Sequence, residues 1–129
     1  MRVKRIKVGI KSWAEQKKEL QAVFREVTQK GKLPTEETLY FTDLEAFRKC
    51  LTPKRLELLW AVAEKRPQSV RELATLVKRE LKNVSEDLDY LSQVGLVEFR
   101  SSSAHGNALA PVVPYDRVDF SLDLRRRAA

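Results

Sequence analysis

The sequence predicts an α+β fold that is mainly helical. Apolar residues recur at helical spacing through most of the chain, and several of these stretches follow residues with the spacing of helix caps. Short runs of alternating apolar residues, typical of strands, stand near both ends. A length of 129 residues with 43% hydrophobic content suffices for one compact domain with a modest core.

Residues 1–42 are expected to form a strand followed by a helix. Within residues 2–10, Ile6, Val8 and Ile10 recur at every second position among basic residues, as in a short strand. Ser12 and Glu15 have the spacing of a capping box, which satisfies free amides at a helix start. The apolar positions of the helix that follows are Trp13, Leu20, Phe24 and Val27. A second short strand is expected at 39–41.

Two helices should follow, opening at Thr42 and Thr52. Thr42 and Glu45 repeat the capping-box spacing. Thr52 precedes Pro53, which suits the first helical position because its missing N–H costs nothing there. The apolar stripe expected on the second helix consists of Leu56, Leu59, Trp60 and Ala63.

A pair of helices comes next, joined by the turn 78–80. Ser69 and Glu72 form a third capping box and open the first of the pair. The second is expected over about 81–94, with Gly95 as a left-handed cap. The predicted core positions of the pair are Val70, Leu73, Ala74, Val77, Val84, Leu88, Leu91 and Val94.

Strands are expected after this pair of helices. A strand should begin at 96–99, the small polar residues of 101–111 should form a loop, and 112–122 should supply one or two more strands. A winged helix-turn-helix has its elements in this same order: helix, short helix, turn, helix, strand, loop and strand. The expected division is therefore an extension at 1–42, a winged helix-turn-helix at 43–124 and a basic tail at 125–129.

Several stretches carry a resemblance to known proteins over about residues 43–115. They are Leu51–Leu59, Val70–Ala74, Asn83–Val84, Asp87–Leu91, Gly95–Val97 and Pro114–Asp116. In these residues the chain resembles winged-helix transcriptional regulators, in particular the small MarR-like regulators of bacteria and archaea. The resemblance implies sequence-specific binding to double-stranded DNA and a two-fold homodimer. Some relatives of this group are encoded beside toxin genes, so it also leaves open an antitoxin that binds a toxin protein.

The resemblance implies that the helix at 81–94 enters the major groove, which admits one helix. Asn83 would pair with an adenine edge, and Lys82 with guanine or a phosphate. Glu86, Asp87 and Asp89 oppose the approach of phosphate, but Asp87 and Asp89 could point back into the protein or toward the domain's own basic groups. The full set of predicted DNA-contacting residues is Lys54, Arg55, Arg71, Lys78, Arg79, Lys82, Asn83, Ser85, Glu86 and Arg100.

The expected wing departs from the usual pattern. Winged helices of this group typically place Arg or Lys at the tip, whereas the tip here offers only His105, with Arg100 at its base. Insertion of the wing into the minor groove therefore stays open, and His105 is interpreted as a solvated loop residue.

Charge favours a polyanionic partner, since the net charge is +7. Five of the basic residues fall in 2–11 and three in 125–127. These termini would either lie along the DNA backbone or serve only solubility.

Residues 1–50, which remain once the winged helix is assigned, are expected to build the dimer interface. Trp13, Phe24 and Trp60 are predicted to be core rather than platforms for base stacking.

No enzyme, cofactor or metal site is expected, because the sequence lacks a Gly-rich phosphate loop, a nucleophile elbow and metal-ligand spacing. A single cysteine, Cys50, allows no internal disulfide, and it should be a buried small hydrophobe. No signal peptide or membrane span is evident, so a cytoplasmic protein is expected. The rival interpretation is a winged helix used for protein–protein contact; RNA binding is a third, for which exposed stacking aromatics are not evident.

Overall fold

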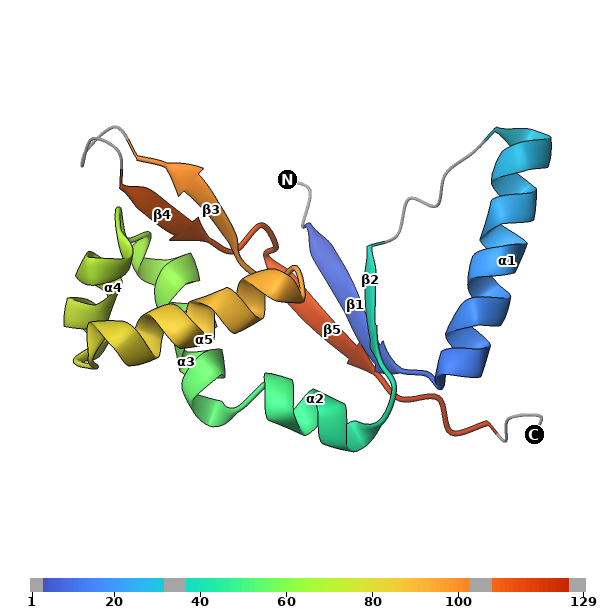
Figure 1. Ribbon diagram of the computed structural model, residues 1–129, viewed down its shortest axis with the longest axis horizontal. Coiled ribbons are helices and arrows are strands. Elements are labelled where there is room, and N and C mark those ends of the chain that lie inside the picture. Colours follow the sequence, from blue (N-terminus) through green and yellow to red (C-terminus); the bar gives the residue numbers. More distant parts are fainter. Residues whose placement is uncertain (1–3, 32–36, 103–107, 126–129) are drawn as a thin grey trace. The chain divides into compact units, whose positions relative to one another are not determined.

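A computed structural model describes residues 4–31, 37–102 and 108–125 (Figure 1). It confirms an α+β fold in which helix exceeds strand. Its elements are, in order, β1 (Arg5–Ile10), α1 (Trp13–Lys30), β2 (Thr38–Phe41), α2 (Leu44–Cys50), α3 (Pro53–Lys65), α4 (Val70–Val77), α5 (Leu81–Gln93), β3 (Glu98–Ser101), β4 (Leu109–Val112) and β5 (Arg117–Ser121). No helix in these described ranges is long and apolar enough to cross a membrane.

Three of the four predicted helix caps are confirmed. The side chains of Ser12, Thr52 and Ser69 accept hydrogen bonds from backbone N–H groups three residues on, at 3.2, 3.2 and 3.0 Å. The prediction for α2 was wrong by one residue, because the carboxylate of Asp43 rather than Thr42 accepts the N–H of Ala46 at 2.8 Å. Asp and Thr are both good N-caps, so spacing alone did not separate the two positions.

The described chain divides into two compact units that interleave along the sequence. We call Arg5–Phe47 with the segment from Arg117 onward the sheet unit, and Arg48–Asp116 with Lys4 the helical unit. The boundaries of these units differ from the expected contiguous ranges 1–42 and 43–124, since β5 pairs with β1. The expected tail at 125–129 lies outside the described residues except for Arg125.

The sheet unit contains a parallel three-stranded sheet in the order β2-β1-β5. Ile6 pairs with Val118 and Val8 with Phe120, which places alternate apolar side chains on one face. Phe47 packs against that face at Phe120, with its ring centroid 4.7 Å from the Phe120 ring, and leaves Val118 and Phe120 partly exposed. This apolar pairing explains why β5 joins β1 instead of extending the hairpin of the helical unit.

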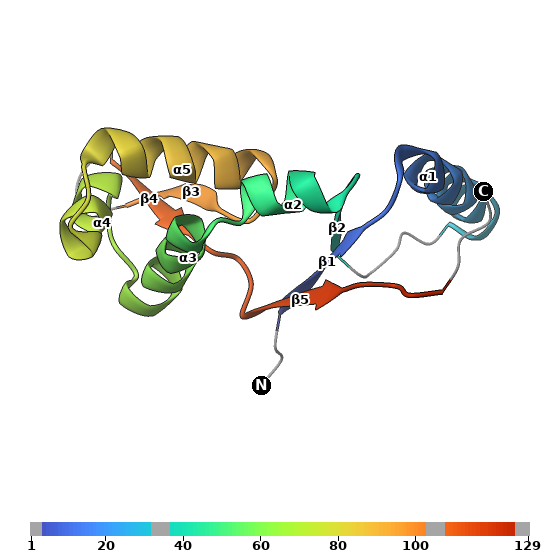
Figure 2. The same ribbon diagram turned by 90° about the horizontal axis from the view of Figure 1, so that it is seen from below.

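The helical unit packs α3, α4 and α5 together against the antiparallel hairpin β3–β4 (Figure 2). Val84, Leu88 and Leu91 of α5 are fully buried, as the spacing predicts. The other fully buried side chains of this unit include Cys50, Leu58, Leu73, Leu96, Val97 and Pro111. The burial of Cys50 is confirmed as well. The hairpin begins earlier than expected: Leu109 already pairs with Ser101, within the stretch predicted to be loop.

The aromatic side chains contradict the predicted core. Trp13, Phe24 and Trp60 are all mainly exposed. On α3 the buried positions are Leu58, Leu59 and Val62, so the predicted stripe was wrong except at Leu59. A helix that is apolar on more than one side, as α3 is, does not reveal from its sequence which side faces the core.

Candidate functional site

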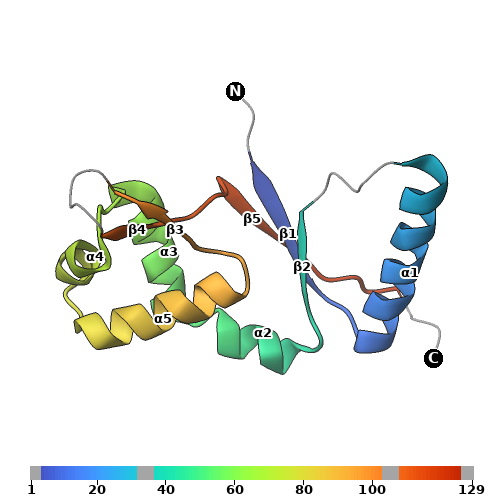
Figure 3. The ribbon, with the colours of Figure 1, turned by 45° about the horizontal axis from the view of Figure 1, so that its top comes forward.

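The helices α4 and α5 are joined by the short turn 78–80, as predicted (Figure 3). Lys78 adopts a left-handed conformation with φ 57°, and its N–H bonds to the carbonyl of Thr75 at 3.2 Å. The N–H of Arg79 bonds to the carbonyl of Ala74 at 3.0 Å. These bonds satisfy the last carbonyls of α4 and redirect the chain sharply into α5.

The start of α5 presents polar side chains away from the core. Val84 is fully buried, whereas Lys82, Asn83 and Glu86 are exposed and Ser85 is half-buried. Because an α-helix makes one turn in 3.6 residues, Val84 points to the core and its polar neighbours point away from it. Four residues of the predicted site, Lys82, Asn83, Ser85 and Glu86, are thus brought together on the first turns of one helix.

Arg55 and Arg79, which were predicted to contact phosphates, are paired within the protein. Arg55 Nε lies 3.1 Å from one carboxylate oxygen of Asp87, and an Arg79 Nη lies 2.7 Å from the other. The side chains of Arg55, Arg79 and Asp87 are only 18%, 20% and 18% exposed. Asp87 therefore links α3, the turn and α5. Its return toward the protein's own basic groups, one of the two alternatives for this residue, is confirmed.

Arg55 makes further contacts that hold it in place. It donates to the carbonyls of Lys49 and Cys50, and its guanidinium carbon lies 4.2 Å from the centre of the Tyr90 ring. Sequence reasoning missed this cluster, because Arg55 and Asp87 are 32 positions apart and nothing in the pattern pairs them. The one available signal was local: Tyr90 follows Asp87 by three residues and so shares its side of α5.

Other predicted cations remain at the surface. Lys54, at the start of α3, and Arg71 and Lys78, at opposite ends of α4, are exposed. Arg100, on β3, is exposed as well and pairs with Glu98 at 2.9 Å. An ion pair in which both side chains are more than half exposed contributes little to stability, so Arg100 can exchange this partner for another anion at small cost.

A groove of about 630 Å³ lies within the helical unit, beside α5. It is lined by Val70, Arg71, Leu81, Asp89, Phe99 and Leu109, among others. The exposed Asp89 thus lines a largely apolar groove together with Arg71. The tip of the expected wing, with His105, lies outside the described residues.

Two observations bear on metal and thiol chemistry in the described part of the chain. No group of three or more His, Cys, Asp or Glu side chains within the described ranges could hold a metal ion. Burial raises the pKa of the Cys50 thiol, although the charge of Arg55 opposes this rise. A buried thiol that resists ionisation is a poor nucleophile.

Comparisons with known proteins add one finding. No curated protein matches the chain. The profile of the family described as HVO_A0114 matches residues 50–120, which contain α3, α4, α5, the hairpin and nearly all of β5. This match covers more than half of the 129 residues. The chain belongs to the HVO_A0114 family.

Proposed function

We propose that the protein is a winged-helix transcriptional regulator that binds double-stranded DNA in a sequence-specific manner. In this proposal α4, the turn 78–80 and α5 form the helix-turn-helix, and β3–β4 is the wing. The observation that carries the proposal is the start of α5, where exposed Lys82 and Asn83 project from a helix whose opposite side is fixed in the core. A rigid helix with polar side chains at its N-terminal end suits the major groove.

The pairing of Asp87 supports this assignment electrostatically. A free carboxylate on α5 would repel the phosphates of DNA. Two guanidinium groups hold Asp87, so its charge is compensated within the protein. Exposed Lys78, Arg71 and Lys54 then supply positive charge for phosphate contacts, and Arg55 and Arg79 are assigned to holding the helices.

Loss of a base contact and loss of a phosphate contact should change DNA affinity in different ways, which fluorescence anisotropy can measure. Replacing Asn83 with Ala should reduce discrimination at one base pair by about 1–3 kcal/mol. Replacing Lys78 with Ala should instead weaken all sequences about equally and lower the slope of log affinity against log salt by about 0.9. Lys65→Ala removes the same charge from the exposed end of α3 and is the matched control. Equal behaviour of the Lys78 and Lys65 variants would contradict the proposal.

A second function is favoured by one specific observation. Glu86 and Asp89 are exposed on α5, and Asp89 lines the largely apolar groove beside it. This combination suits an apolar protein segment with basic residues, such as one from a toxin bound by an antitoxin. Absence of DNA binding at low salt, together with a stable complex with a protein encoded by a neighbouring gene, would favour this alternative.

A further inference from the structure

One face of the parallel sheet in the sheet unit is polar. Ile6 and Val8 lie on the apolar face, so the alternate residues Arg5, Lys7 and Gly9 lie on the other. The neighbouring strands add polar residues to this second face: Thr38 and Tyr40 from β2, and Arg117, Asp119 and Ser121 from β5. Parallel sheets are normally covered by apolar packing on both faces, so this polar face is a candidate surface for a ligand.

The polar face carries an excess of positive charge. Arg5 lies directly across from Arg117, and like charges in such positions destabilise a sheet. Asp119 compensates one of them, because it pairs with Arg117 at 2.9 Å. Within the described ranges neither Arg5 nor Lys7 has an ion pair. An anion bound to this face would therefore be attracted by it.

A pocket of about 600 Å³, which we call the sheet pocket, lies within the sheet unit. Its lining comes from β1, α1, β2 and the end of β5 with the segment after it, and includes Lys7, Lys11, Glu19, Tyr40, Ser121 and Arg125. Because Lys11 follows β1 and residues 122–125 follow β5, the pocket lies at the carboxyl ends of these two strands. Its volume falls within the roughly 300–1,000 Å³ of small-molecule sites.

The strand order explains the position of the sheet pocket. From β1 the chain passes through α1 to β2 on one side, whereas β5 lies on the other side of β1. The order therefore reverses at β1, which makes the carboxyl ends of β1 and β5 a topological switch point. Open parallel sheets bind their ligands, mononucleotides among them, in the crevice at such points. This likeness of topology predicts where a ligand site should be, and the sheet pocket lies there.

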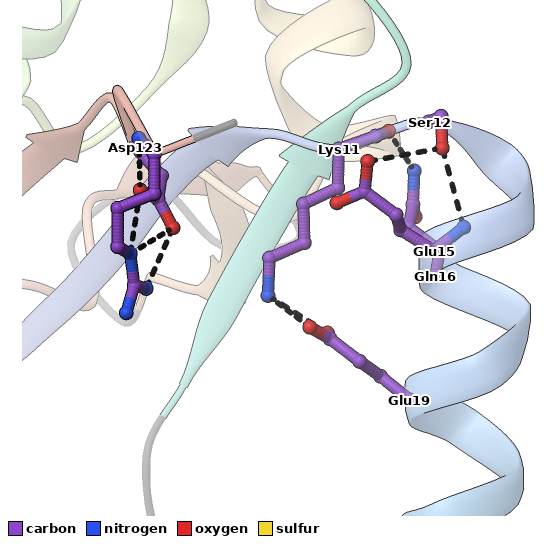
Figure 4. A network of polar contacts seen from close by, with 7 residues as sticks. Lys11, Ser12, Glu15, Gln16, Glu19 and Asp123 are labelled. Carbon is purple, nitrogen blue, oxygen red and sulfur yellow. Dashed lines mark hydrogen bonds and ion pairs between the residues drawn. The ribbon is translucent and has the colours of Figure 1, made fainter. Parts of the chain in front are cut away.

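Two of the cations in the sheet pocket are paired with carboxylates that are about half exposed. Lys11 Nζ donates hydrogen bonds to Glu19 at 2.6 and 2.8 Å and lies 4.1 Å from the centre of the Tyr40 ring (Figure 4). Arg125 pairs with Asp123 at 2.7 Å. The side chains of Glu19 and Asp123 are 52% and 47% exposed. Exposed ion pairs contribute little to stability, so both carboxylates can turn toward solvent at small cost when an anion binds.

Lys7 is the cation of the sheet pocket without such a partner. It is half-buried, and its side chain has no hydrogen bond or ion pair within the described part of the chain. A charged group that is partly withdrawn from water is stabilised by a partner of opposite charge. The pocket therefore combines one unpaired ammonium group with two cations whose partners are readily exchanged.

We propose that the sheet pocket binds a small phosphorylated molecule of about the size of a mononucleotide, with its phosphate held by Lys7 and Lys11. A phosphate suits several converging cations better than a carboxylate does, because it carries up to two charges and three strong acceptor oxygens. The carboxylates of Glu19 and Asp123 already bind cations of the protein, so the pocket favours an anion. This site goes beyond the proposed function and requires neither α5 nor DNA.

Isothermal titration calorimetry at low salt tests the site with adenosine monophosphate, inorganic phosphate and adenosine. The monophosphate should bind, inorganic phosphate should bind more weakly, and adenosine, which lacks the anion, should not bind. Lys7→Met should weaken binding of the monophosphate by about tenfold or more, because a charge-assisted hydrogen bond is lost. Lys17→Met is the matched control, since it removes the same charge from an exposed position on the side of α1 opposite Glu19. An equal loss for both variants would show only general attraction to a basic protein and would overturn the proposal.

A second pair of variants tests the position of the site. Ser121 lines the sheet pocket and is exposed, so both Ser121→Asp and Ser121→Ala should keep the urea midpoint of the wild type. Ser121→Asp should abolish binding of adenosine monophosphate by charge repulsion, whereas Ser121→Ala should retain it. Equal binding by these two variants, or no binding of either phosphorylated probe to the wild type, would overturn the proposal. If Lys7→Met then weakened binding to duplex DNA, this face would contact a nucleic-acid backbone instead.

Discussion

Replacement of Asp87 by Asn should destabilise the helical unit, because this one carboxylate binds two arginines. Arg55 and Arg79 approach different oxygens of Asp87, at 3.1 and 2.7 Å. An Asn amide has one acceptor oxygen, so it can serve only one of the two guanidinium groups. The other is left without its anionic partner, and Arg79 already has one buried Nη atom without a hydrogen bond among the described residues.

The size of the effect follows from burial. Breaking a fully buried ion pair costs about 3–5 kcal/mol, whereas exposed pairs contribute about 0–1 kcal/mol. With about a fifth of each side chain exposed, this cluster lies between the limits, and we expect a loss of about 2 kcal/mol.

Urea unfolding measures this loss directly. With a slope of about 1–3 kcal/mol/M, the midpoint should fall by about 1 M. Asp89→Asn is the matched control: it removes the same charge two residues away from an exposed side chain, and it should shift the midpoint little. A loss below about 0.5 kcal/mol for Asp87→Asn, or equal losses for both variants, would refute the structural role of the cluster.

Three further predictions concern stability. Gly9→Ala should cost about 1–3 kcal/mol in urea unfolding, because a Cβ there would lie 3.0 Å from the backbone oxygen of Ser121 and 3.1 Å from the Tyr40 ring; an unchanged midpoint would contradict this packing. Cys50 should react slowly with iodoacetamide until the chain unfolds, and rapid alkylation of the native protein would exclude its burial. Because burial raises the pKa of the Cys50 thiol, the stability that the neutral thiol contributes should be lost as pH rises above about 8.5. Partial burial lowers the pKa of Lys11, but its hydrogen bonds and attraction to a carboxylate and a phenol outweigh that effect and raise the pKa overall. The stability from this ion pair is therefore present below about pH 10.4 and lost above it, so Lys11→Met should remove part of the alkaline loss, and an identical pH profile would contradict it.

Local signals predicted most of the elements. These signals are local, because each involves residues only a few positions apart, and they can therefore be identified from the sequence. They include the caps at Ser12, Thr52 and Ser69 and the helical spacing of Val84, Leu88 and Leu91. The same signals placed Lys82 and Asn83 correctly on the exposed side of α5.

Contacts between distant residues were not predictable. The pairing of β5 with β1 depends on Phe120 and Val8 meeting across more than a hundred positions, and alternation alone cannot select a partner strand. Arg55 illustrates the same limit at the site. A basic residue at a helix start suits a phosphate equally well, until the fold brings Asp87 beside it.

Sequence-specific binding to duplex DNA is tested most directly by titrating the protein onto DNA from upstream of its own gene and onto a scrambled duplex. Fluorescence anisotropy at several salt concentrations gives both affinities and their salt dependence. We predict a clear excess of affinity for the upstream DNA, with a slope of about 0.9 per phosphate contact. Equal affinity for both duplexes, or no binding at low salt, would contradict the proposal that α5 recognises a DNA sequence.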